Sequence, residues 1–126
     1  EWDVSSISSF EYLFDAERTP EAATFNEDVS SWNVGKAKRM TGMFRGASSF
    51  NQDLSSWNVS HVEDMVSMFQ DAIALNQSLC SWGLLLDASI VNVSFAFANA
   101  TSCPRTKDPD LVNNSPPGPF CAVCKP

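Results

Sequence analysis

FNEDVSSWNVGKAKRMTGMFRGASS at residues 25–49 is followed directly by FNQDLSSWNVSHVEDMVSMFQDAIA at residues 50–74. The two stretches align without a gap and share their apolar positions. The matched pairs are Phe25 and Phe50, Trp32 and Trp57, Val34 and Val59, Met40 and Met65, Met43 and Met68, and Phe44 and Phe69. A third copy begins at Leu75 and diverges after Trp82, and a partial copy occupies residues 2–14. A fixed period of this size predicts stacked repeats, because each copy can bury its apolar side only against its neighbours.

The pattern within one repeat predicts a strand followed by a helix. Residues 57–59 alternate apolar, polar and apolar side chains, which is typical of a strand with one buried face. Ser60 and Glu63 have the spacing of a capping box, and apolar residues then recur at helical spacing from Val62 to Ala72. The predicted fold class is therefore an α/β repeat, a right-handed β–α solenoid of about four coils.

We expect four coils near residues 1–24, 25–49, 50–74 and 75–102, with a Cys- and Pro-rich cap at 103–126. Two aromatic columns should form the core of the repeats. The first column contains Trp2, Trp32, Trp57 and Trp82, and the second contains Phe14, Phe44, Phe69 and Phe97. A recurring asparagine at positions 26, 51 and 76 is interpreted as an internal ladder that satisfies buried backbone groups.

The repeat resembles the BspA-like leucine-rich-repeat surface proteins, whose units read approximately F-N-x-D-[LI]-S-x-W-[ND]-V-S-x-V-x-x-M-x-x-M-F-x-x-A. Residues 50–72 carry this pattern, from Phe50-Asn51-x-Asp53-Leu54 to Met68-Phe69, and the similarity covers residues 1–101. The Cys-rich end is similar to the segment that follows such repeats in algal members. The resemblance implies a leucine-rich-repeat-like fold and a secreted or cell-surface protein without catalytic activity.

Composition limits the classes of partner. The chain has 8 basic and 15 acidic residues and a net charge of −7, which argues against nucleic acid and against anionic membranes. No stretch approaches the length of about 18 apolar residues that a transmembrane helix requires. The basic residues Lys36, Lys38, Arg39 and Arg45 are interpreted as a solvated face. Because the chain opens inside a repeat, we expect residue 1 to belong to a processed or longer protein.

The four cysteines lie in the C-terminal half, at Cys80, Cys103, Cys121 and Cys124. We expect all four to form disulfides that hold the proline-rich tail against the last coil, with any of three pairings open. A zinc site is an alternative, although a second close Cys pair is missing. A redox Cys-x-x-Cys is a further alternative, although no helix is expected to follow it.

Five Asn-x-Ser/Thr sequons suggest modification by N-linked glycans, which are expected if the source is eukaryotic. Asn92 and Asn99 are the first candidates, followed by Asn113 and Asn58. Asn76 is excluded because the ladder should place it inside the stack.

No motif indicates catalysis or a cofactor, and the single histidine, His61, occupies a variable surface position of the repeat. We therefore expect a non-enzymatic extracellular or cell-surface protein that acts through protein or glycan contacts, in adhesion or an extracellular matrix. The contact face should be the exposed strand positions Ser31, Asn33, Ser56, Asn58, Ser81 and Gly83. The alternative is a subunit of an extracellular filament that assembles with copies of itself, head to tail, through open solenoid ends.

Overall fold

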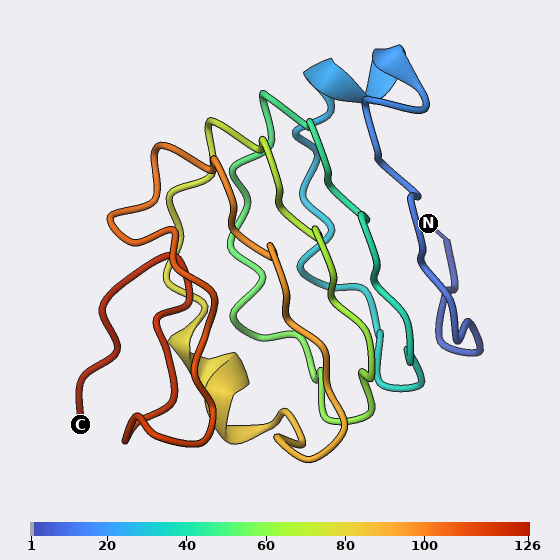
Figure 1. Cartoon of the computed structure of the whole chain (residues 1–126). Helices are drawn as coiled ribbons and strands as arrows, with labels where there is room; N and C mark the ends of the chain where they lie inside the picture. The colour runs from blue at the N-terminus through green and yellow to red at the C-terminus, as the bar shows by residue number, and fades with distance from the viewer. Residues whose placement is uncertain (1) are drawn as a thin grey trace.

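The computed structural model describes residues 2–126. Within these residues the only helices are two short 3₁₀-helices, η1 (Pro20–Thr24) and η2 (Cys80–Leu84). The repeats form successive coils that lie side by side (Figure 1). Isolated parallel bridges join Ser9 to Arg39, Arg39 to Asp64 and Asp64 to Asn92, so that equivalent positions of neighbouring coils are in register.

The predicted β–α solenoid is wrong. Residues 2–126 contain no α-helix and no strand longer than an isolated bridge, and the capping box at Ser60 and Glu63 does not form. The Glu63 amide donates instead to the carbonyl of Lys38 in the preceding coil, and the Ser60 amide donates to Asn58 Oδ1. The segment that follows Val62 is consequently a series of turns.

Alternating backbone amides explain why a turn series replaces the helix. The amides of residues 40, 42, 44 and 46 donate to carbonyls of the next coil, at 2.8–2.9 Å. The amides between them, at residues 43, 45 and 47, donate to the carbonyl three residues earlier in their own coil. The same alternation recurs in the coils on either side. Neighbouring coils therefore take up the amides that an α-helix would have used internally.

Left-handed backbone conformations recur at two positions of each coil and interrupt any helix. One position holds Tyr12, Gly42, Ser67 and Phe95, and the other holds Gly46, Asp71 and Asn99, with φ between 58° and 70°. Such residues are uncommon outside glycine because their Cβ crowds the backbone. The repeat thus turns sharply every few residues, which keeps each coil short.

The core is continuous along the stack. Phe14, Phe44, Phe69 and Phe97 form a column with ring centroids 5.4–5.5 Å apart. Trp57 and Trp82 are fully buried and each donates its indole N–H to a carbonyl of the preceding coil, at 3.0–3.1 Å. Trp2 is 74 % exposed and lies outside the core that the repeat pattern predicted for it, although it stacks on Trp32 at 6.4 Å.

Irregular segments interrupt the repeat at three places. Helix η1 protrudes between the first two coils, where Phe14 and Phe25 are 11 residues apart whereas the equivalent Phe44 and Phe50 are 6 apart (Figure 1). Helix η2 and the turns that follow it replace the regular third repeat. The tail from residue 103 folds back over the last coil, where the ring of Phe120 meets Phe97 edge-on at 6.3 Å.

Candidate interaction surface

A row of small polar side chains runs across the coils on the outer surface. Five of the six predicted contact positions are exposed, namely Ser31, Asn33, Ser56, Asn58 and Ser81. The sixth, Gly83, is buried, because a Cβ there would lie 3.0 Å from Pro117 and 3.1 Å from Phe120. The tail therefore ends the row at the third repeat. We call the five exposed positions the polar row.

Hydrogen bonds hold four of the five side chains of the polar row, all except Ser31. The Ser81 hydroxyl donates to the carbonyl of Ser55 in the preceding coil, at 2.8 Å. Asn33 Oδ1 accepts from the amide of Gly35, at 3.0 Å, and Asn58 Oδ1 accepts from Ser60, at 3.1 Å. Both asparagine Nδ2 groups thus stay available as outward donors. Ordered donors of this kind lose little conformational entropy on binding.

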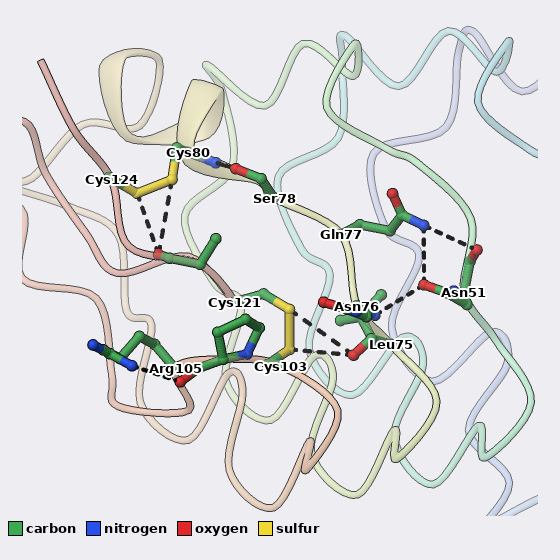
Figure 2. The surroundings of a disulfide bond; sticks show 12 residues. Asn51, Leu75, Asn76, Gln77, Ser78, Cys80, Cys103, Arg105, Cys121 and Cys124 are labelled. Atoms are coloured by element: carbon green, nitrogen blue, oxygen red, sulfur yellow. Dashed lines mark hydrogen bonds between the residues drawn. A yellow bond between two sulfur atoms is a disulfide. The ribbon is translucent and has the colours of Figure 1, made fainter.

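The asparagine ladder is present, but it lies at the surface. Asn26 Oδ1 accepts the amide of Asn51, and Asn51 Oδ1 accepts the amide of Asn76, at 2.8 and 2.9 Å. Gln77 adds a bond from Nε2 to Asn51 Oδ1, as Figure 2 shows. Asn76 is exposed, so the prediction that the ladder buries it is wrong. A side-chain amide can align two coils while one of its faces remains in water.

The basic residues do not form one solvated face. Arg39 pairs with Glu11 at 3.8 Å, whereas Arg45 reaches inward to a carboxylate. Lys36 and Lys38 form no ion pair within residues 2–126 and line a hollow of about 330 Å³ together with His61. The other lining residues are Ser6, Ser8 and Gly35. We call these six residues the basic hollow.

The carboxylate that Arg45 reaches is Asp15, which is fully buried. Arg45 Nη2 lies 2.9 Å from Asp15 Oδ2, and the amide of Glu17 donates to Asp15 Oδ1 at 2.9 Å. The hydrogen bond to Asp15 is the main cause that raises the pKa of Arg45 above its ordinary value. Arg18 completes the cluster by stacking on the Tyr12 ring at 3.5 Å. Sequence reasoning missed this cluster, because Asp15 and Arg45 are paired only by the register of the first two coils.

Disulfides join Cys80 to Cys124 and Cys103 to Cys121, and all four cysteines are paired. Figure 2 shows that the Cys80–Cys124 bond joins the third repeat to the end of the tail, and that the Cys103–Cys121 bond closes the tail on itself beside Leu75, with the two sulfur atoms 3.5 and 4.0 Å from the Leu75 carbonyl oxygen. The expected disulfides are therefore present, with a pairing that the sequence left open. The zinc site and the redox Cys-x-x-Cys would both require free thiols, and every cysteine is in a disulfide.

The sequon asparagines of the divergent region are all exposed, as is Asn58. Their amide groups differ in availability. Asn99 Nδ2 donates to Asp71 at 2.8 Å and Asn113 Nδ2 donates to Asp110 at 3.2 Å, whereas Asn58 and Asn92 use only Oδ1. Because a glycan attaches to the side-chain nitrogen, the structure favours Asn58, Asn92 and the exposed Asn76 as acceptors, and the ground on which Asn76 was excluded is removed.

His61 is the only imidazole and it is exposed. Its Nδ1 lies 2.9 Å from the carbonyl of Gly35, which can only accept, so Nδ1 carries the proton. Residues 2–126 hold no group of three or more His, Cys, Asp or Glu side chains that could bind a metal ion. The described part of the chain also contains no helix long and apolar enough to cross a membrane.

Comparison with known proteins gives one match. No curated protein matches the chain, and no solved structure does. The model of a family described as "Mycoplasma protein of unknown function, DUF285" matches residues 1–108, which include all of the repeats and exclude most of the tail. The protein belongs to this DUF285 family.

Proposed function

We propose that the protein is a BspA-like, non-enzymatic repeat protein of the extracellular space or cell surface, and that it acts through contacts with glycans or proteins. The observation that carries this proposal is the polar row. Its serine and asparagine side chains recur in register on successive coils, and all except Ser31 are held by hydrogen bonds to the backbone. A regular row of fixed donors suits a partner that is itself extended and repetitive.

The two disulfides support an extracellular location, since such bonds persist in oxidising compartments. The exposed sequon at Asn92, which lies outside the polar row, supports a glycosylated protein if the source is eukaryotic. The algal-type interpretation of the Cys-rich end belongs to the same proposal. It is consistent with a tail that covers the last coil and lies mostly outside the family match.

The second candidate function is a filament subunit that assembles head to tail. The exposed Trp2, at the first coil, favours a contact at that end of the stack. The opposite end is covered, because Phe120 packs on Phe97 and Asp108 accepts the amide of Phe95 at 2.9 Å. Head-to-tail contact of identical chains would have to displace this tail. The contact function is therefore the better supported of the two.

Two binding assays test the contact function. One measures binding of the protein to an array of immobilised glycans, and the other measures binding to a surface coated with the same protein. We expect the wild type to bind at least one class of immobilised glycan or protein partner, and Ser56→Arg to reduce that binding. Ser49→Arg is the matched control, because Ser49 is also exposed and lies outside the polar row. An equal loss of binding in both variants, or no binding by the wild type, would refute the role of the polar row in contacting a partner. The mass of the native protein before and after deglycosylation tests the glycans separately.

A further inference from the structure

We propose that the basic hollow binds an acidic carbohydrate, by holding a sulfate or carboxylate group of the sugar chain. This inference deepens the contact function and rests on it for the choice of a glycan as partner. The hollow measures about 330 Å³, at the lower end of the usual range of about 300–1,000 Å³ for small-ligand sites. That size suits one charged group with the sugar ring that carries it.

The repeat register assembles the hollow from three coils. Ser6, Lys36 and His61 occupy one repeat position, and Ser8 and Lys38 occupy another two residues later. The amide of Lys38 donates to the carbonyl of Ser8 at 2.7 Å, which fixes the first two coils against each other. The hollow is thus built on the ordered backbone of the stack, and its side chains project from fixed points.

The two lysines are free to meet an anion. Neither Lys36 nor Lys38 forms an ion pair with any group of residues 2–126, although Arg18, Arg39 and Arg45 all do. Arg105, Lys107 and Lys125 also lack an ion pair within these residues, so the position of Lys36 and Lys38 in one hollow is what sets them apart. Because both lysines line the hollow, an oxyanion bound there can accept charge-assisted hydrogen bonds from two ammonium groups.

The remaining polar groups of the hollow suit the same ligand. The hydroxyls of Ser6 and Ser8 have no hydrogen-bond partner within residues 2–126, so each can donate to a bound oxygen. The imidazole of His61 is held by Gly35, which leaves Nε2 as its remaining polar atom. In the next coil the position equivalent to Lys38 holds the acidic Glu63, so the basic surface ends there.

The hollow adjoins the polar row, and this continuity selects a carbohydrate among possible anions. A Cβ on Gly35 would lie 3.1 Å from Asn33 Oδ1 and 3.9 Å from Asn58 Nδ2, so Gly35 belongs to both surfaces. A sugar chain could place its acidic group between the lysines and its hydroxyls along the row of amides and serine hydroxyls. A small free anion would use only the hollow.

The decisive experiment compares dextran sulfate with uncharged dextran, measured by titration calorimetry at two salt concentrations. The test variant Lys36→Ser/Lys38→Ser takes the serines that the first coil has at these positions, so the fold should be retained. The control variant Lys107→Ser/Lys125→Ser changes the net charge equally. We expect the wild type to bind dextran sulfate and not dextran, and the test variant to bind it about tenfold or more weakly. The affinity of the control variant for dextran sulfate should stay within about twofold of that of the wild type.

Further outcomes separate the sources of the anion. Sodium sulfate alone should shift the amide resonances of Gly35 and His61 and bind more weakly than the polymer. Equal weakening in both variants would show long-range charge only, and weakening in the control alone would place the ligand at the second hollow, beside Arg105 and Lys107. Binding of a phosphorylated peptide in place of the polymer, with the same lysine dependence, would overturn the assignment to carbohydrate. Sulfate binding by a protein that fails every adhesion test would retain this site and refute the proposed function.

Discussion

Gly42→Ala tests the turn series directly. The substitution should lower the free energy of unfolding if residue 42 lies in a left-handed turn and raise it if residue 42 lies in a helix. Gly42 has φ of +58°, and a Cβ there would lie 2.7 Å from Cδ1 of Tyr12. A left-handed non-glycine residue costs about 1–2 kcal/mol, and crowding a packed ring costs a further 1–3 kcal/mol. The reduced entropy of the unfolded chain returns about 0.4–1 kcal/mol. We expect a net destabilisation of about 3 kcal/mol, whereas a helix would gain about 1 kcal/mol from the same change.

Urea unfolding with the disulfides intact measures this difference, and two variants separate its causes. Gly46→Ala has the same backbone strain at φ +70° but meets only the flexible Glu17 side chain, at 3.3 Å, so we expect a loss of about 1 kcal/mol. Ser67→Gly relieves strain at φ 58° and should gain up to about 1 kcal/mol. Stabilisation by Gly42→Ala together with destabilisation by Ser67→Gly would refute the turn series and restore the helix.

Three further predictions concern the tail, the turns and the buried ion pair. Replacing Cys103 and Cys121 by alanine should lower the free energy of unfolding by about 3 kcal/mol, because their sequence separation is 18, and hydrogen exchange should then rise in the tail before the central coils. Hydrogen bonds from the Ser55 hydroxyl and amide hold the pKa of Asp53 below its ordinary value, so its stabilising effect is complete above the unfolded pKa of about 3.9 and is lost as pH falls through the lower folded pKa. Asp53→Asn should accordingly unfold with a weaker dependence on pH between about pH 5 and pH 2, measured by urea midpoints; an unchanged slope would contradict the assignment. Arg45→Met leaves the buried Asp15 carboxylate without its closest cation and should destabilise by about 3 kcal/mol, while Arg39→Met, at an exposed pair, should change stability by less than about 1 kcal/mol.

The repeat register could be predicted from the sequence, but the local backbone could not. Met40, Met43, Phe44 and Ala47 are all buried, and their spacing fits one face of a helix. Linked turns that point every third or fourth side chain inward produce the same spacing, so periodicity alone does not separate the two. The distinguishing signal was Gly42 with Gly46, since two glycines four residues apart disfavour a helix and suit left-handed positions.

The surface was harder to predict than the core, because it depends on which residues of different coils meet. The predicted contact positions followed from the alternation of Trp57, Asn58 and Val59, and five of the six are exposed. The buried Asp15 and the basic hollow required the structure, since each joins residues 25 or more positions apart. The burial of Gly83 depended on the path of the tail, which no repeat specifies.

The direction of the hydrogen bonds makes the two ends of the stack chemically different. Every regular coil donates amides to the coil that follows it, so the first coil presents the carbonyls of Ser9, Glu11 and Leu13 without a backbone donor among residues 2–126. The same edge also carries the amides of Ser8 and Ser9, which have no acceptor among residues 2–126 and are equivalent to the Lys38 and Arg39 amides that donate to the preceding coil, so it offers more acceptors than donors. The donor edge of the last coil is the complement, but Asp108 already occupies the amide of Phe95. A segment that pairs with this edge must supply amides to these three carbonyls, and another copy of this chain could supply them from its last coil only after its tail had left that coil. The tail thus favours contacts along the side of the stack, where the polar row and the basic hollow lie, over growth from its ends.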